Sequence, residues 1–336
     1  MSPMHYLPAL AALVVSHACL WLLLSPPARR LMLDHPNVRS LHEQPVPRSG
    51  GIAIAAGVAA GAALGNAVAG TIGAVLGVAG ALAALSLADD LFTLPTLLRL
   101  AAHLAAAAAA VGLVIGVSGP MPFGLLALAV AWYANLYNFM DGSDGLAGGM
   151  AVFGFGAYAW AAHQSGQVML TTVSASIAFA SLAFLLVNFH PARLFMGDVG
   201  SVPLGFLAGA LGVLGWRDGA WPLWFPVLVF APFVCDATLT LVKRLLRRER
   251  VWQAHKDHYY QRLVRMGFGH RGAAWIEYAA MAACAAGALF ARSAGPSVQI
   301  GVLGAAAAAL IVVAIWIDLR WARWSRAPHD SGGAPV

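Results

Sequence analysis

The sequence predicts an all-α, polytopic integral membrane protein with about eleven transmembrane helices, its N-terminus outside and its C-terminus in the cytoplasm. Hydrophobic residues make up 60% of the 336 positions and charged residues only 10%, whereas a soluble domain carries about 25% charged residues. Apolar runs of about 20 residues, the length of helix that crosses a hydrocarbon core of about 30 Å, recur along the whole chain. The basic residues gather in alternate loops between these runs, which is typical of a multi-pass membrane protein.

The apolar runs define the expected elements in order. We expect spans at 4–25, 50–68, 70–88, 98–118, 121–137, 145–163, 167–187, 201–215, 221–242, 273–291 and 297–318. The first run is followed by SPPARR and not by a small-residue cleavage site, so we interpret it as a retained span. No polar block of domain size interrupts the series, so residues 1–318 are expected to form one transmembrane domain and 319–336 a cytoplasmic tail. The cysteines all lie in apolar runs without CxxC spacing, which predicts small buried residues and neither a disulfide nor a metal site.

The loops set the orientation. If 26–49, 89–99, 138–144, 188–200, 243–272 and the tail after Asp318 face inward, every Lys and Arg except Arg217 and Arg292 lies on the inner side. The net charge of +6 then reflects membrane topology, and no nucleic-acid partner is expected. In the tail, Trp316, Trp321 and Trp324 alternate with arginines, which is typical of an anchor at the membrane interface.

Acidic residues are concentrated in the same inward loops. Asp89 and Asp90 end an apolar run, so both carboxylates are expected at the membrane boundary, where ionisable groups are costly and tend to be functional. Adjacent carboxylates repel each other unless a cation or a metal-bound phosphate neutralises them. Arg99 follows nine residues after Asp90 and is placed to meet a phosphate from the opposite side.

A second cluster lies at the junction of two spans and reads NLYNFMDGSDGLA, from Asn135 to Ala147. Its oxygen ligands suit Mg²⁺, which keeps several waters and takes one or two protein groups together with substrate phosphates. A calcium loop is the alternative, but the terminal Glu of such a loop is absent at the required offset. The carboxylates of this cluster are Asp141 and Asp144.

The third cluster is NFHPARLFMGDVGS, from Asn188 to Ser201. Asp198 precedes a Gly-Ser helix start, where backbone N–H groups can also receive an anion. Asn188 and Phe195 are candidates to recognise a nucleobase, by hydrogen bonding and by stacking, with ordinary packing as the alternative for Phe195.

The longest inward loop contains His255 and His258, which would share one face of a helix because they are three residues apart. No third ligand at zinc spacing appears nearby. Basic residues crowd the segment from Lys243 to Arg271, which favours contact with anionic lipid headgroups or with a diphosphate. A purely topological role is the alternative.

Taken together, these segments resemble the polyprenyl-phosphate N-acetylhexosamine-1-phosphate transferases, glycosyltransferase family 4. The resemblance runs from about Asp34 to Arg271 through five signatures in the family's order: DHPNVRSLHEQPVPRSGG, ADDLFTLPTLLRL, NFMDGSDGLAGG, NFHPARLFMGDVGS and HKDHYYQRL. The last signature looks more like the branch that initiates O-antigen and exopolysaccharide synthesis than like the phospho-MurNAc-pentapeptide translocase, whose loop carries three consecutive histidines.

The resemblance also implies roles for single residues. Asp198 and Asn138 would be Mg²⁺ ligands, with Mn²⁺ as an alternative ion, and Asp89 and Asp90 would lie beside the acceptor phosphate as the catalytic pair. Arg99 would hold phosphates. The remaining site residues would bind the nucleotide sugar, with Arg48 as a further site residue: Asp141, Asp144, Asn188, Phe195, His255, His258 and Arg262.

By the same resemblance, the expected activity is transfer of a sugar 1-phosphate from a UDP-N-acetylhexosamine to undecaprenyl phosphate. It would take place in the bacterial inner membrane, with the active site facing the cytoplasm and the bilayer as a further partner. A homodimer and the identity of the sugar stay open. An intramembrane Mg²⁺-dependent prenyltransferase is one alternative, although the only DxxD spacing is Asp141 with Asp144. A secondary transporter is the other, although the charges stop at one boundary and no clear internal repeat appears.

Overall fold

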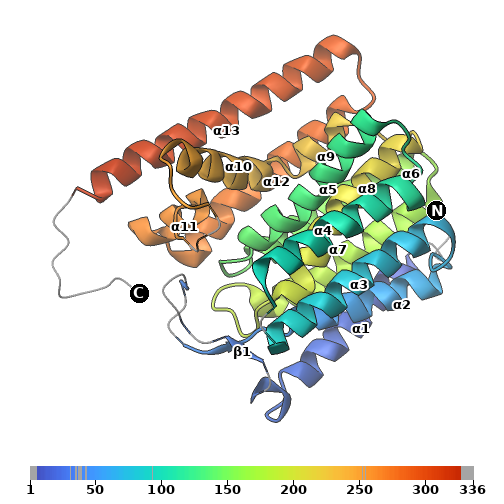
Figure 1. Cartoon of the computed structure of the whole chain (residues 1–336), viewed down its shortest axis with the longest axis horizontal. Helices are drawn as coiled ribbons and strands as arrows, with labels where there is room; N and C mark the ends of the chain where they lie inside the picture. Colours follow the sequence, from blue (N-terminus) through green and yellow to red (C-terminus); the bar gives the residue numbers. More distant parts are fainter. Residues whose placement is uncertain are drawn as a thin grey trace.

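The structure, a computed structural model, describes residues 6–30, 32–34, 36, 40–41, 44–92, 94–251, 253 and 255–326. Parts of the first signature (35, 37–39 and 42–43), residue 93 of the second and the tail beyond 326 lie outside the described residues. The chain folds into a bundle of helices with α13 running along one edge (Figure 1).

Each expected span coincides with helix. The first eight are α1 (Leu7–Leu23), α2 (Gly50–Leu64), α3 (Gly70–Phe92), α4 (Thr96–Ala108) with the π-helical segment η3 (Ala109–Val114), α5 (Pro120–Phe139), α6 (Leu146–Gln164), α7 (Val168–Asn188) and α8 (Asp198–Arg217). The rest are α9 (Trp224–Val229) with α10 (Ala231–Leu246), then α12 (Gly269–Ala291) and α13 (Pro296–Trp324). Helices satisfy their backbone groups internally, which lipid requires of any spanning segment.

Two details differ from the expected elements. The ninth span is broken between α9 and α10, because Pro232 in the first turn of α10 has no N–H to continue the preceding helix. The inward loop 26–49 contains a short helical turn, η2 (Ala28–Arg30), and a small sheet. In that sheet β1 (Leu33–Asp34) pairs antiparallel with β2 (Val46–Pro47).

Six helices in the described part of the chain are long and apolar enough to cross a membrane: α3, α4 with η3, α7, α8, the stretch Tyr259–Ala291 that ends in α12, and α13. α1 and α2 are shorter apolar helices. The chain is therefore a multi-pass α-helical membrane protein. The count of eleven spans and the orientation of the termini stay predictions.

The centre of the bundle is α8, which packs against α2, α3, α5 and α6. Small residues allow these helices to approach closely in lipid. A Cβ on Gly51 of α2 would lie 2.2 Å from the backbone nitrogen of Gly200, and one on Gly205 would lie 2.3 Å from the carbonyl oxygen of Tyr133 in α5. These approaches fix the start of α8 beside the end of α5 and the start of α2.

Candidate active site

Four helix ends bring the carboxylates and arginines of three signatures into one cluster. Asp89 and Asp90 lie in the last turn of α3, Arg99 in the first turn of α4, Asn138 in the last turn of α5, and Asp198 at the start of α8. We call these residues, together with Arg48, the carboxylate–arginine cluster. Arg48 and Asp198, which are 150 positions apart in the sequence, therefore meet at one end of the bundle.

Arg99 connects two of the carboxylates. Its Nη1 lies 2.8 Å from Oδ2 of Asp89 and 3.8 Å from Oδ2 of Asp198. Asn138 donates its amide N–H to Oδ1 of Asp198 at 2.8 Å and lies 3.0 Å from the hydroxyl of Ser201. Asp198 is thus held between a cation and an amide, and its side chain keeps 34% of its surface exposed.

Arg48 pairs with the third carboxylate of the cluster, that of Asp90. Its guanidinium lies 3.3 Å from Oδ1 of Asp90, whose side chain is only 4% exposed. The second oxygen of Asp90 is buried and makes no hydrogen bond with any residue that the structure describes. A buried carboxylate oxygen without a donor is costly, so the cluster has capacity for a further cation or hydrogen-bond donor.

The loop before α8 is fixed to the loop before α2 by backbone hydrogen bonds. The N–H of Phe195 donates to the carbonyl of Pro47 at 2.7 Å, and the N–H of Gly50 donates to the carbonyl of Phe195 at 2.9 Å. Gly197 has a φ of +73°, and a Cβ there would lie 2.5 Å from the carbonyl oxygen of Arg48, so this approach requires glycine. Arg48 and Asp198 are placed together in this way.

A second polar group joins the loops that carry Asp144 and Asn188. Asp144 accepts hydrogen bonds from Nδ1 of His190 at 2.6 Å and from the N–H of Ala192 at 3.1 Å, and its other oxygen lies 3.8 Å from Nδ1 of His270. The imidazoles of His190 and His270 stack with their centroids 5.4 Å apart. The sequence reasoning missed both histidines. His190 lies inside a signature and could have been noticed there, whereas no local pattern marks His270.

The side chain of Asn188, a candidate to recognise a nucleobase, makes hydrogen bonds within the protein. Its amide oxygen accepts the N–H of Gly145 at 2.9 Å, and its amide nitrogen donates to the carbonyl of Leu194 at 2.9 Å. The buried amide therefore holds the two loops in register. Contact with a nucleobase, by Asn188 or by Phe195, stays a prediction.

Asp141 lies on the turn that follows α5. Burial raises the pKa of its carboxyl well above the usual value, and the negative charges of Asp198 and Asp34 raise it further. A cation near these three carboxyls would lower that pKa again.

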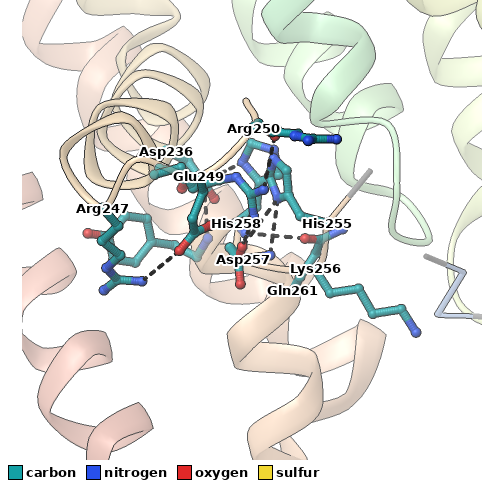
Figure 2. A network of polar contacts seen from close by, with 12 residues as sticks. Asp236, Arg247, Glu249, Arg250, His255, Lys256, Asp257, His258 and Gln261 are labelled. Carbon is teal, nitrogen blue, oxygen red and sulfur yellow. Dashed lines mark hydrogen bonds and ion pairs between the residues drawn. The ribbon is translucent and has the colours of Figure 1, made fainter. Parts of the chain in front are cut away.

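The loop that carries His255 and His258, which we call the histidine loop, folds against the end of α5. Residues 255–258 are not helical, so the expectation that the two histidines share one face of a helix is wrong. His258 precedes α11 (Tyr259–Leu263), and its Nδ1 donates to Oδ1 of buried Asp236 at 3.0 Å. His255 and His258 nevertheless lie side by side, with ring centroids 4.9 Å apart (Figure 2). Burial lowers the pKa of His255 to about 4, and the positive charges of His258 and Arg244 contribute.

The role of Asp236 also follows from this network. It accepts the backbone N–H groups of Tyr259 and Tyr260, both at 3.0 Å, and so caps α11. The nearby cations have other partners: Lys243 pairs with Asp318, and Arg244 pairs with Asp257 and Glu249. The hydroxyl of Tyr260 donates to the carbonyl of Phe139 at 3.2 Å, which ties the histidine loop to the end of α5.

Arg262 faces α13 and not the loops of Asp141 and Asp144. Its guanidinium donates to Asp318 at 2.8 Å and lies over the rings of Tyr259 and Trp321. The side chain is almost fully buried there. The structure therefore gives Arg262 an anchoring contact with α13, and its contact with a nucleotide sugar stays a prediction.

The chemistry of the cluster suits a phosphorylated substrate. Among the described residues, no three His, Cys, Asp or Glu side chains approach closely enough to hold a metal ion by themselves. The exposed carboxylate of Asp198 and the amide of Asn138 do match an ion such as Mg²⁺, which takes one or two protein ligands and fills its remaining positions with water and phosphate. Arg48 and Arg99 add charge that can meet phosphate oxygens.

A helical membrane bundle whose carboxylates and arginines meet at one end defines a class: a multi-pass membrane enzyme that handles phosphorylated substrates. The model of the family described as glycosyl transferase family 4 matches residues 72–215. A decaprenyl-phosphate N-acetylglucosaminephosphotransferase of Mycolicibacterium smegmatis is 30% identical over 85% of this chain and 80% of the relative.

Two further relatives carry related names. A probable undecaprenyl-phosphate N-acetylglucosaminyl 1-phosphate transferase of Bacillus subtilis is 28% identical over 76% of this chain and 78% of that protein. An undecaprenyl-phosphate alpha-N-acetylglucosaminyl 1-phosphate transferase of Escherichia coli K12 is 26% identical over 72% and 71%. The chain belongs to glycosyl transferase family 4, the polyprenyl-phosphate N-acetylhexosamine-1-phosphate transferases, and is a sugar-phosphate transferase. Membership decides against the prenyltransferase and transporter alternatives.

Proposed function

We propose that this enzyme transfers an N-acetylhexosamine 1-phosphate from a UDP-sugar to undecaprenyl phosphate at the cytoplasmic face of the bacterial inner membrane. The products are UMP and a lipid diphosphate sugar, which would initiate an O-antigen or exopolysaccharide. The names of the relatives support the polyprenyl phosphate and the N-acetylglucosamine type of sugar. The observation that carries the proposal is the junction of Arg99 with Asp89 and Asp198.

The reaction joins two anions, so charge repulsion is its main barrier. An oxygen of the lipid phosphate attacks the phosphorus that bears the sugar, the bond from this phosphorus to the bridging oxygen breaks, and UMP leaves with the electron pair. Arg99 and Arg48 would reduce the repulsion by holding phosphate oxygens. The second pKa of a phosphate monoester is about 6, so Asp89 and Asp90 need only align the acceptor near neutral pH.

Asp198 and Asn138 would hold Mg²⁺, or Mn²⁺ in its place. When bound, the ion supplies positive charge to the diphosphate and orients it for displacement. Removal of divalent cations with EDTA should abolish UMP release, and added Mg²⁺ should restore it. Turnover that persists in EDTA would contradict the metal assignment.

The test of the reaction uses purified enzyme with undecaprenyl phosphate and a panel of UDP-sugars. Mass spectrometry of the lipid fraction should find one lipid diphosphate sugar, together with an equal amount of UMP. Asp198→Asn should lower the rate by at least about 100-fold, the scale on which loss of a transition-state contact acts. Asp218→Asn is the matched control, because Asp218 lies beside Arg217 at the opposite end of α8. If no UDP-sugar yields a lipid product, the proposed function is wrong.

A further inference from the structure

The last third of α13 and the π-helical segment η4 (Val264–Phe268) form a surface of arginines and aromatic rings. We call it the α13 arginine patch and define it by Arg265, Arg320, Arg323, Arg326, Trp316, Trp321 and Trp324. It includes a hollow of about 500 Å³ lined by Met266, Trp316, Leu319, Arg320, Arg323 and Trp324. None of these residues belongs to the carboxylate–arginine cluster.

Two arginines of the patch are held by aromatic rings. The guanidinium carbon of Arg320 lies 4.9 Å from the ring centroid of Phe268 and 5.6 Å from that of Trp316. The guanidinium carbon of Arg265 lies 4.7 Å from the ring centroid of Trp321. A cation–π contact fixes a guanidinium but leaves most of its in-plane N–H donors available to an anion.

The positive charge of the patch is not compensated within the described part of the chain, where no Asp or Glu forms an ion pair with these four arginines. Asp318 is the single acidic residue of α13, and it is already bonded to Lys243 and Arg262. The patch therefore presents four cations to the surroundings of the helix.

The position of the patch along α13 predicts that it lies at the level of lipid headgroups. An 18-residue stretch of α13 is highly apolar, with a mean hydropathy of 2.6, and this stretch is largely exposed. The arginines follow directly where this apolar run stops, and tryptophans accompany them as at membrane interfaces. Leu319 is 58% exposed and Trp316 40% exposed. Acyl chains can therefore lie along the helix, on the side of the guanidinium groups that faces the membrane interior.

We propose that the α13 arginine patch binds an anionic diacyl phospholipid of the inner leaflet, with its phosphate on Arg320 and Arg323 and its acyl chains against Trp316 and Leu319. Juxtamembrane arginines gain from anionic headgroups in this way. The site goes beyond the proposed function, because it lies on α13 and needs neither substrate.

The test measures lipid retention and not turnover, so its outcome is separate from that of the proposed function. The purified full chain is equilibrated with equal amounts of phosphatidylglycerol and phosphatidylcholine of identical acyl chains, and native mass spectrometry counts the retained lipid of each class. The wild-type protein should retain phosphatidylglycerol about tenfold or more over phosphatidylcholine. Arg320→Gln with Arg323→Gln should abolish the preference, and raised salt should weaken it.

The matched control is Arg247→Gln with Arg248→Gln, which removes the same charge from the exposed turn after α10. These two arginines belong to the basic segment from Lys243 to Arg271 but not to the patch, so the control separates a general attraction of that segment for anionic headgroups from retention by the patch. This variant should keep the wild-type preference. Arg320→Lys with Arg323→Lys keeps the charge and should retain an intermediate preference, which guards against a misfolded double Gln variant. The proposal is overturned if wild type retains both lipids equally, if the Arg320 and Arg323 variant keeps the preference, or if the control loses it equally.

Discussion

At the scale of single residues, Arg99 is the side chain on which the cluster depends most. It neutralises Asp89 and Asp198 at once, and the two carboxylates would otherwise raise the cost of bringing a diphosphate near them. The backbone N–H of Leu94 also donates to Asp89 at 2.7 Å, so Asp89 is held by both α4 and the turn before it.

We expect Arg99→Gln to lower kcat by about 100-fold or more, because charge repulsion among carboxylates and phosphates returns. Arg99→Lys should recover part of the rate, since an ammonium keeps the charge but cannot replace the planar fork of donors. Steady-state kinetics of UMP release measures both. A kcat for Arg99→Gln within about twofold of wild type, by the same scale, would show that Arg99 takes no part in catalysis.

His255 gives a prediction for pH. The pKa of His255 is lowered from 6.5 to about 4, so between these values the unfolded chain binds a proton on this imidazole that the folded chain does not. Stability is therefore lost as the pH falls from about 6.5 towards 4, and this contribution is flat above 6.5. Thermal unfolding should show a smaller loss in this window for His255→Gln than for wild type. Equal losses would contradict the lowered pKa.

At the scale of elements, close helix packing decides where the site residues lie. The start of α2 contacts the start of α8 so closely that a Cβ on Gly51 has no room beside Gly200. The same contact carries the hydrogen bond from the N–H of Gly51 to the carbonyl of Met196 at 2.8 Å. Arg48 and Asp198 are the predicted site residues at either side of it.

Gly51→Ala should therefore lower stability by about 1–3 kcal/mol, because backbone must move to accept the methyl group. The control is Gly77→Ala on α3, where an added Cβ meets open space and the change should be neutral or stabilising by up to about 1 kcal/mol. Thermal unfolding in detergent compares the two. If both variants unfold at the same temperature, the α2–α8 contact is looser than the structure indicates.

At the scale of the whole molecule, the candidate active site forms because alternate loops meet at one end of the bundle. The carboxylate–arginine cluster, Asp144 with its histidine partners, and the histidine loop all lie at helix ends. The positive-inside rule predicts that these ends face the cytoplasm. Arg217 donates to the carbonyl of Ile115 at 2.6 Å, and Arg292 donates to the carbonyl of Ala220 at 2.9 Å. These two arginines therefore join helices at the opposite end.

This arrangement predicts the outcome of cysteine labelling in intact cells. In a cysteine-free background, Arg247→Cys and Ser325→Cys should be protected from an impermeant thiol reagent, whereas Ser118→Cys and Ser293→Cys should react. All four positions are exposed in the structure, so access to the reagent depends on the membrane side alone. Reaction of an inner and an outer position to the same extent would contradict the orientation.

Much of this protein could be predicted from its sequence. Hydropathy alone placed a helix at every expected span, because a chain in lipid must satisfy its own backbone groups and has few other ways to do so. The signatures identified the family, which the comparisons confirmed. They also marked Asp89, Arg99, Asn138 and Asp198 as site residues, and the structure places these four together.

Tertiary structure decided which polar groups are partners. Nothing local to Asp236 indicates that it caps α11, nor that Arg262 is bonded to Asp318 on α13, nor that His270 lies beside Asp144. Hydropathy reports the free energy of each segment in lipid, which is a property of the segment itself. Hydrogen bonds and ion pairs act over a few ångströms, so they depend on how the helices pack, and packing joins residues that are far apart in the chain.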